Sequence, residues 1–211
     1  MTLIGVLGAG GQAREVADFA PGAEVAFFAV DEPYFSDGAR VAGVPLIDLT
    51  RASAEERALP VVVAVGAPGL RNDLVSRWPG ERYTSVLAEH GYRSPRATIA
   101  DGCIVAPGAT LMADCVLERH VLVNAGATIG HGTVIEAFAT LSPGVHVGGD
   151  STIGRGSFIG IGASVANGVT VGEGVRIGAG AVVLNDLEPW GVYVGIPARR
   201  VRRVEEWLRG F

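Results

Sequence analysis

The chain has 211 residues, enough for one large domain or two small ones. Its hydrophobic content of 48% provides for a buried core, and its net charge of −5 argues against a grip on nucleic acid that is independent of sequence. No apolar run approaches the roughly 20 residues that span a bilayer. Residues 1–7 carry no basic leader, so we expect a cytoplasmic protein without a signal peptide.

The first ninety residues alternate short apolar runs with helical segments. The predicted strands are residues 3–7, 25–30, 43–47, 61–65 and 83–87. The predicted helices are residues 13–20, 53–59 and 68–78, the second of which has Ser53 and Glu56 as a capping box. Because such alternation is typical of a parallel sheet with helical crossovers, we expect a small Rossmann-like α/β domain over residues 1–92.

The turn after the first strand carries Gly8, Gly10 and Ala13 at the spacing of a phosphate-binding loop. Glycines let the backbone approach a phosphate, and the helix N-terminus behind them supplies N–H donors and a positive dipole end. Asp31 or Glu32, at the end of the second strand, would accept a ribose hydroxyl. The pattern fits a nucleotide or nucleotide-sugar site, or a tight turn without a ligand. It does not fit a dehydrogenase, because no hydride-transfer domain follows.

The rest of the chain is a hexapeptide repeat followed by a short tail. Every sixth residue is a branched aliphatic: Ile99, Val105, Leu111, Leu117, Val123, Ile129, Ile135, Leu141, Val147, Ile153, Ile159, Val165, Val171, Ile177 and Val183. An unbroken period of six is typical of a β-helix solenoid, so we predict a parallel β-helix over residues 93–184. Residues 185–211 are predicted to form an irregular segment and a final helix over residues 199–208.

The period also predicts which residues share a column of the solenoid. Three blocks complete a triangular coil of about 18 residues, and coils stack at roughly 4.8 Å. This rule places His131 next to Gly149 and Glu118 next to Glu136. The flat faces of a solenoid need cover, for which a homo-oligomer is the simplest arrangement.

Cysteines and histidines are the side chains best suited to metal binding. Cys103 and Cys115 take inward positions of their blocks, so we expect buried, reduced thiols. The spacings of the last three histidines do not match the coil length, so we expect no metal site. The four histidines are His90, His120, His131 and His146.

His131 differs from the other histidines because Gly130 and Gly132 flank it at a corner of the coil. A lone surface histidine often has no function. A neutral imidazole near pH 7 nevertheless suits general-base removal of a proton from a hydroxyl or amine. The residues alone leave both interpretations open.

With these features the sequence resembles the bacterial sugar acyltransferases that join a small α/β nucleotide-binding domain to a left-handed β-helix. That family includes sialic acid O-acetyltransferases and N-acetyltransferases acting on UDP-4-amino-sugars and GDP-perosamine. The closing VGxPA segment is shared by many hexapeptide acyltransferases, so it indicates only the superfamily. The N-terminal α/β domain restricts the resemblance to this family. The segments that carry it are Gly8–Gly11 with Asp31–Glu32, Gly43–Ile47, Val63–Gly66 with Arg71, Val123–Gly126, Gly130–His131, Leu141–Gly144 and Val194–Arg199.

The resemblance implies a homotrimer that binds acetyl-CoA between adjacent β-helices. It assigns His131 as the general base for direct attack of the sugar's amine or hydroxyl on the thioester, with Asn124 in the same cleft. It places the acetyl-CoA site at Thr140, Gly149, Ile161 and Ala179. It places the nucleotide contacts at Gly10, Gly11, Gln12, Asp31 and Glu32.

Three positions depart from the family's pattern. The residue after the base, usually Asp or Glu, is Gly132, the second histidine is replaced by Thr140, and the histidine of the loop is replaced by Gln12. A carboxylate orients a catalytic histidine and supports its charge, so its loss predicts a slower base. Another carboxylate would have to replace it, with two candidates nearby: Glu136 and Glu118.

The sequence therefore predicts a CoA-dependent acyltransferase, in the first place an acetyltransferase, acting on an amino or hydroxyl group of a nucleotide sugar. Gly132 and Thr140 favour the alternative of a non-catalytic trimeric binding or scaffold protein with the same fold. A third reading is an acyltransferase with another acceptor, such as a secondary-metabolite amine, at a site remodelled by Gln12, Asp31 and Glu32.

Overall fold

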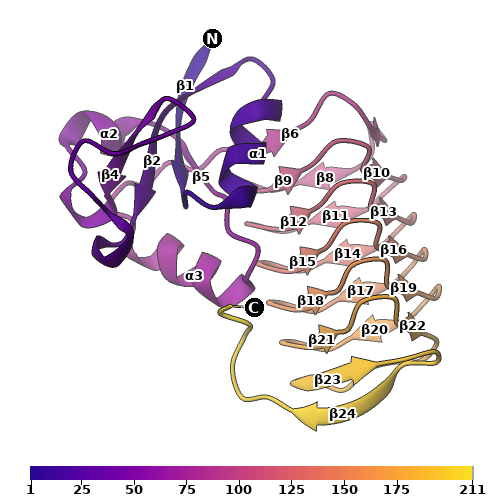
Figure 1. Cartoon of the computed structure of the whole chain (residues 1–211). Coiled ribbons are helices and arrows are strands. Elements are labelled where there is room, and N and C mark those ends of the chain that lie inside the picture. The colour runs from indigo at the N-terminus through magenta and orange to yellow at the C-terminus, as the bar shows by residue number, and fades with distance from the viewer. Residues whose placement is uncertain (211) are drawn as a thin grey trace.

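The computed structural model describes residues 1–210, and it places an α/β unit against one side of a long stack of coils (Figure 1). The parallel strands of that unit are β1 (Thr2–Leu7), β2 (Ala23–Val30), β4 (Val44–Asp48) and β5 (Val61–Val63). Their order in the sheet is β4-β2-β1-β5, and β3 (Arg40–Val41) pairs antiparallel with β4 at the edge. None of the helices within residues 1–210 has the length and apolar character needed to cross a membrane.

Helices and helical turns connect these strands. They are α1 (Gly11–Phe19), η1 (Glu32–Tyr34), η2 (Leu49–Arg51), α2 (Ala54–Ala58) and α3 (Pro68–Arg77). The predicted capping box of α2 is present, with Ser53 and Glu56 each bonding the other's main chain. The predicted alternation of strands and helices is thus confirmed, and the sheet is parallel apart from its β3 edge.

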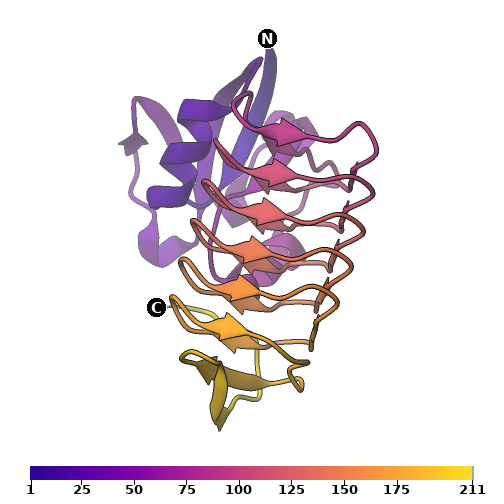
Figure 2. The same ribbon diagram turned by 90° about the vertical axis from the view of Figure 1, so that its right-hand side faces the viewer.

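The stack of coils is a parallel β-helix with three sheets, seen from another side in Figure 2. Sheet 1 faces the α/β unit and contains β6 (Val86–Leu87), β9 (Ile104–Val105), β12 (Leu122–Val123), β15 (Thr140–Leu141), β18 (Phe158–Ile159), β21 (Arg176–Ile177) and β23 (Gly191–Val194). Sheet 2 contains β7 (Tyr92–Arg93), β10 (Thr110–Leu111), β13 (Thr128–Ile129), β16 (His146–Val147), β19 (Ser164–Val165) and β22 (Val182–Val183). Sheet 3 contains β8 (Thr98–Ile99), β11 (Val116–Leu117), β14 (Val134–Ile135), β17 (Thr152–Ile153) and β20 (Thr170–Val171).

Successive coils pair in a fixed register. Thr128 pairs with His146 and Thr140 pairs with Phe158, so partners lie 18 residues apart as the column rule predicts. The branched aliphatic positions point inward and form one continuous core, in which Ile129 and Leu141 are fully buried. Cys103 and Cys115 are buried and free, as expected for reduced thiols.

The coils extend further at both ends than the hexapeptide pattern. The segment predicted as the last strand of the α/β sheet, residues 83–87, is divided between the two parts of the chain. Tyr83 forms a parallel bridge with Val61 of β5, whereas Val86–Leu87 form β6, which pairs with β9 of sheet 1. The predicted helix over residues 199–208 is wrong, because β24 (Arg199–Arg203) is a strand antiparallel to β23. The free edge of β23 offers main-chain hydrogen bonds to β24, whereas an isolated helix of about ten residues is marginal in water.

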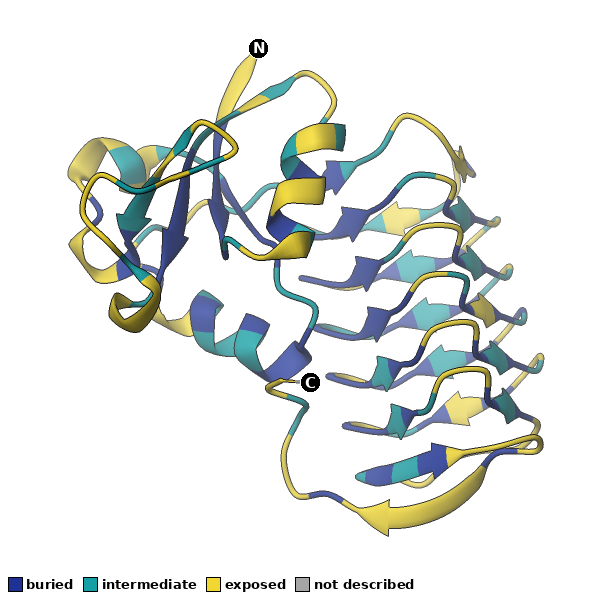
Figure 3. Cartoon of the chain, in the orientation of Figure 1, coloured by how far each residue is buried: buried dark blue, intermediate teal, exposed yellow. Residues whose placement is uncertain are grey.

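Arg71 of α3 joins the α/β unit to the β-helix. Its guanidinium is buried and donates to five main-chain carbonyls and to the Thr140 hydroxyl. Two of those carbonyls, on Val65 and Gly66, belong to the α/β unit, and the others belong to successive coils. Burial lowers the pKa of Arg71 to about 9. Strands β9, β12 and β15 of sheet 1 are correspondingly buried under the unit (Figure 3).

His120 occupies the corner between sheets 3 and 1 beside this junction. Its ring lies 4.8 Å from the Tyr83 ring and 5.0 Å from the Phe138 ring, measured between centroids. Gly102 in the same column has φ +78°, and a Cβ there would come within 2.2 Å of the imidazole Nδ1. Burial, followed by the charges of Arg119 and Arg71, lowers the pKa of His120 to about 4.

We expect Arg71→Met to lower the free energy of unfolding by about 3 kcal/mol or more, because it leaves several buried acceptors without a donor. Urea unfolding measures the change. Arg82→Met is the matched control, since Arg82 is exposed and donates to one carbonyl, that of Ala58. Equal stabilities of the two variants would contradict the role given to Arg71.

His120 predicts a loss of stability at acidic pH. The unfolded chain protonates this histidine near pH 6.5 and the folded chain only near pH 4, so stability falls as the pH drops through this window. His120→Phe is expected to make the urea midpoint less pH-dependent there. Phe is tolerated at this left-handed corner, because Phe138 adopts φ +62° one coil further on. Identical pH dependences would contradict the assignment.

Candidate active site

A cavity of about 980 Å³ lies between the α/β unit and the β-helix. The α/β wall consists of the loop after β1, the ends of β2 and β5, Tyr34 of η1, and Leu70 and Leu74 of α3. The β-helix wall consists of sheet 1 and of the turns that follow β12, β15, β18 and β21, with Asn124, Ser142, Gly160 and Gly178. A cavity of this size lies at the upper end of the range for small-molecule sites.

The glycine loop after β1 is open toward the cavity. Gly8 adopts φ +110°, and a Cβ there would come within 2.9 Å of Val65 Cγ2, so this position favours glycine for conformation and packing. Side chains at Gly10 and Gly11 would meet nothing within 4 Å. Helix α1 begins at Gly11 and has no side-chain cap, so its first N–H groups are available to an anion.

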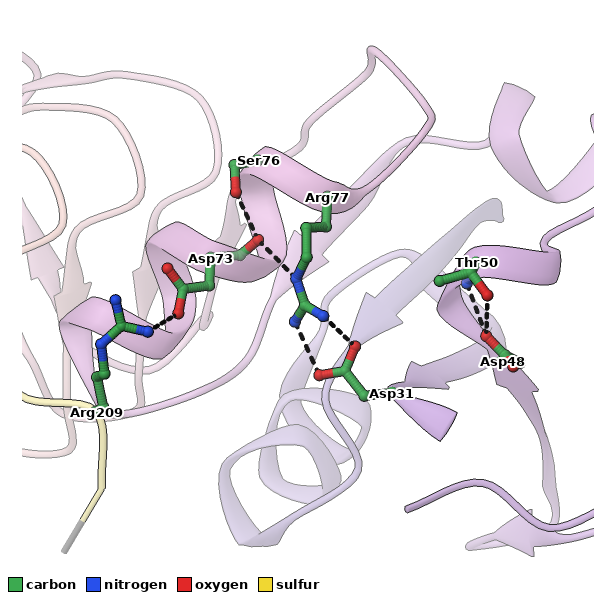
Figure 4. A network of polar contacts seen from close by, with 7 residues as sticks. All are labelled: Asp31, Asp48, Thr50, Asp73, Ser76, Arg77 and Arg209. Carbon is green, nitrogen blue, oxygen red and sulfur yellow. Dashed lines mark hydrogen bonds and ion pairs between the residues drawn. The ribbon is translucent and has the colours of Figure 1, made fainter. Parts of the chain in front are cut away.

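The Asp31 carboxylate lines the cavity but has a partner inside the chain. Arg77 at the end of α3 binds both of its oxygens, at 2.7 and 2.8 Å (Figure 4). This contact raises the pKa of Arg77. Glu32 does not line the cavity, whereas the exposed Tyr34 does. Sequence reasoning missed Arg77 and Tyr34, because neither belongs to a recognisable motif.

Gln12 connects the loop to the β-helix. Asn124 Nδ2 donates to Gln12 Oε1 at 3.1 Å, across 112 positions of sequence. Gln12 Nε2 is buried in the structure without a hydrogen-bond partner among the described residues, and Gln12 lines the cavity. The replacement of the family's histidine therefore leaves a donor at the cavity wall that a bound acceptor atom would satisfy.

Thr140, Ile161 and Ala179 also line the cavity. The Thr140 hydroxyl is already engaged, because it donates to the Gly66 carbonyl at 2.8 Å and accepts from Arg71 at 2.8 Å. Ile161 is 61% exposed, so it offers apolar surface to a ligand. Among the positions predicted to bind acetyl-CoA, Thr140 therefore lines the cavity, but its hydroxyl already has two partners within the chain.

His131 lies at a different corner, in the turn between β13 and β14. Its Nδ1 is 3.5 Å from Asp150 Oδ2, and the two side chains are 66% and 72% exposed. The ring lies against Gly149, where a Cβ would come within 2.6 Å of the imidazole Cε1. Sequence reasoning missed Asp150, although the column rule places it next to Gly132.

Comparisons with known proteins place this architecture. The family model for bacterial transferase hexapeptide (six repeats) matches residues 150–185, and no curated protein matches the chain. The chain is similar to the acetyltransferase domain of PglB from Neisseria gonorrhoeae FA1090, with 32% identity over 95% of this chain and 100% of that one, and a TM-score of 0.85. The chain belongs to the bacterial sugar acyltransferases of the hexapeptide-repeat superfamily.

Two further solved structures are similar to this acyltransferase over nearly its whole length. PerB from Caulobacter crescentus, in complex with CoA and GDP-perosamine, is 29% identical over 96% of this chain and 98% of that one, with a TM-score of 0.86. WeeI from Acinetobacter baumannii AYE shares the fold at 23% identity, with a TM-score of 0.83. The predicted family and its enzymatic character are thus confirmed.

Glu136 does not lie beside His131 in this acyltransferase. Its Oε2 accepts the Arg155 main-chain N–H at 2.9 Å, and Glu118 Oε2 accepts that of Ala137 at 2.9 Å. Both glutamates belong to the corner between sheets 3 and 1, whereas His131 belongs to the corner between sheets 2 and 3. Glu136 therefore does not replace the carboxylate expected after the base.

The chain separates its two candidate chemical centres. The cavity gathers Gly10, Gly11, Gln12, Asp31, Asn124, Thr140, Ile161 and Ala179, and its lining includes neither His131 nor Gly149. Across residues 1–210, no group of three or more His, Cys, Asp or Glu side chains is arranged to hold a metal ion. The acyltransferase thus offers a ligand cavity at one corner of the β-helix and an exposed imidazole at another.

Proposed function

We propose that this acyltransferase moves an acetyl group from acetyl-CoA to an amino group of a nucleotide-linked sugar. The observation that carries the proposal is the glycine loop at the N-terminus of α1, which opens into a cavity that the β-helix shares. The PglB domain is known in complex with acetyl-CoA, and PerB in complex with CoA and GDP-perosamine. Similarity to N-acetyltransferases supports an amine as acceptor, with a hydroxyl as the second choice.

The α/β unit would bind the nucleotide as a Rossmann-like module. The first N–H groups of α1 would receive the diphosphate, and the absence of side chains at Gly10 and Gly11 would leave room for it. Tyr34 offers an exposed ring at the cavity for a nucleobase. Asp31 would act together with Arg77, so a ribose hydroxyl would meet a fixed ion pair rather than a free carboxylate.

The β-helix, left-handed as in the family, would bind acetyl-CoA along its turns. The pantetheine arm would pass Gly149, Ile161 and Ala179. Ile161 would offer it apolar surface, whereas the Gly149 N–H already donates to Asn167 Oδ1. Asn124 would offer an amide to the sugar. The acceptor nitrogen would attack the thioester carbonyl while His131 takes its proton. The carbon–sulfur bond then breaks, and the proton passes to the sulfur of CoA. Main-chain N–H groups would steady the oxyanion.

A homotrimer would bring the two centres together. His131 lies between sheets 2 and 3, whereas the β-helix wall of the cavity lies between sheets 1 and 2. A single chain holds these corners apart on either side of sheet 2. Three copies arranged around an axis facing sheet 2 would place the His131 corner of one copy against the cavity of the next. We place this trimer in the cytoplasm, where its reduced cysteines are stable.

We expect His131→Ala to lower kcat/KM for acetyl transfer by about 10²- to 10⁴-fold, because the general base is lost. Release of free thiol from acetyl-CoA in the presence of amino-sugar nucleotides measures the rate. His90→Ala is the matched control, since His90 is an exposed histidine that lies outside the strands of sheet 2 and does not line the cavity. Near wild-type turnover in His131→Ala would remove this histidine from the mechanism. A wild type that is folded but shows no turnover would instead favour the non-catalytic scaffold alternative.

Mixed trimers test whether neighbouring chains share a site. Gly11→Trp fills the cavity from a position where a side chain meets open space. Neither Gly11→Trp nor His131→Ala is expected to be active alone. Unfolding the two together and refolding them is expected to restore activity, because some sites then combine an intact cavity with an intact His131. No recovery in folded mixed trimers would show that both groups act within one chain.

A further inference from the structure

We propose that Asp150 is the positioning residue of His131, supplied from the next coil in place of the carboxylate that the family carries directly after its base. The inference rests on the proposed function for its catalytic consequence. It concerns a residue that the hexapeptide pattern alone does not mark, because Asp150 is a turn residue, the fourth of the block that begins at Val147.

The contact follows from the register of the coils. Gly132 and Asp150 share one column, 18 residues apart, and the Asp150 N–H donates to the His131 carbonyl at 2.7 Å. This bond fixes the backbone of Asp150 directly over the turn that carries the imidazole. The carboxylate then extends back along the column, and Oδ2 lies 3.5 Å from His131 Nδ1.

Two glycines make the room for this pair. A Cβ on Gly132 would lie 2.3 Å from Asp150 Oδ1, so a side chain at position 132 would displace this carboxylate from its place beside the imidazole. A Cβ on Gly149 would lie 2.6 Å from the His131 ring. Gly132, directly after the base, therefore leaves the space that the Asp150 side chain occupies. The carboxylate beside the imidazole comes from the next coil instead of from the residue after the base.

The contact sets the chemistry of the imidazole. A carboxylate at Nδ1 holds the proton on that nitrogen, which leaves the lone pair of Nε2 to take a proton from the acceptor. It also stabilises the imidazolium that forms. In a single chain both side chains are largely in water, where such pairs contribute little. A neighbouring chain placed over this corner would exclude water and strengthen the contact.

Asp150→Asn tests the role with little risk to folding. Asp150 adopts φ +55°, and asparagine tolerates this left-handed conformation at least as well. We expect kcat to fall by about 10- to 100-fold while the KM for acetyl-CoA stays within about twofold. Asp150→Glu is expected to recover part of the rate, because it returns a carboxylate.

Asp114→Asn is the matched control. Asp114 lies in the same column with φ +62° and pairs with Arg96 at 2.9 Å, away from the imidazole. It is expected to leave kcat unchanged. An Asp150→Asn enzyme as active as this control would overturn the proposal.

A swap of the carboxylate between coils gives a second test. The double variant Gly132→Asp with Asp150→Gly returns the carboxylate to the position after the base, and Asp114 shows that this column accepts aspartate. We expect the double variant to recover at least tenfold over Asp150→Gly alone. A folded double variant that stays as slow as Asp150→Gly would contradict a positioning role.

Side-chain ¹⁵N NMR of His131 separates this proposal from the proposed function. At a pH where the imidazole is neutral, we expect His131 of the wild type to favour the Nδ1–H tautomer. Asp150→Asn is expected to shift the population toward the Nε2–H tautomer. His131→Ala assigns the signals. An unchanged tautomer population in Asp150→Asn would overturn the contact. If wild type transfers no acetyl group, the proposed function fails, while the tautomer measurement still decides whether Asp150 holds His131.

Discussion

The fixed parallel register between coils is the constraint on which the rest of this acyltransferase depends. Each coil places a residue next to the one 18 positions away, as between Thr128 and His146. Inward columns of branched aliphatics fill the core, and outward columns at the corners carry His131 and the turns that line the cavity. The same spacing makes Gly132 and Asp150 neighbours. A residue in one coil therefore forms part of the surroundings of the next, as Asp150 does beside His131.

Arg71 fixes the position of the α/β unit against these regular coils. The buried Arg71 guanidinium has no hydrogen-bonded carboxylate among the described residues. It donates instead to neutral acceptors from both parts of the chain, including the Gly66 carbonyl and the Thr140 hydroxyl. The carbonyl dipoles stabilise the charge of the guanidinium without a counter-ion. Burial still disfavours the charged form, which is why the pKa of Arg71 is lowered. The junction positions the glycine loop opposite the turns of sheet 1, and the cavity forms between them. Thr140, predicted at the acetyl-CoA site, belongs to this junction.

The predictions that succeeded rest on local or periodic signals. Periodicity predicted the β-helix and its columns, Ser53 and Glu56 predicted the start of α2, and the glycine loop predicted a strand-to-helix turn. The predictions that failed, and the contacts that sequence reasoning missed, depend on segments that are distant in the sequence. Arg77 meets Asp31 across 46 positions, and β24 forms because β23 offers an unpaired edge. Glu136 was expected near His131 by sequence proximity, but five residues carry the chain to another corner of the triangle.

The sequence by itself determined the β-helix, the parallel α/β sheet, the glycine loop and the family, because periods, turns and buried strands are encoded locally. Only the tertiary structure decided where the cavity lies, which partner Asp31 has, and which carboxylate lies beside His131. These outcomes depend on which outward side chains meet across coils and across the junction. Asp150 shows the difference: the column rule allowed the contact with His131, but only the direction of its side chain at a left-handed corner brings the carboxylate to the imidazole.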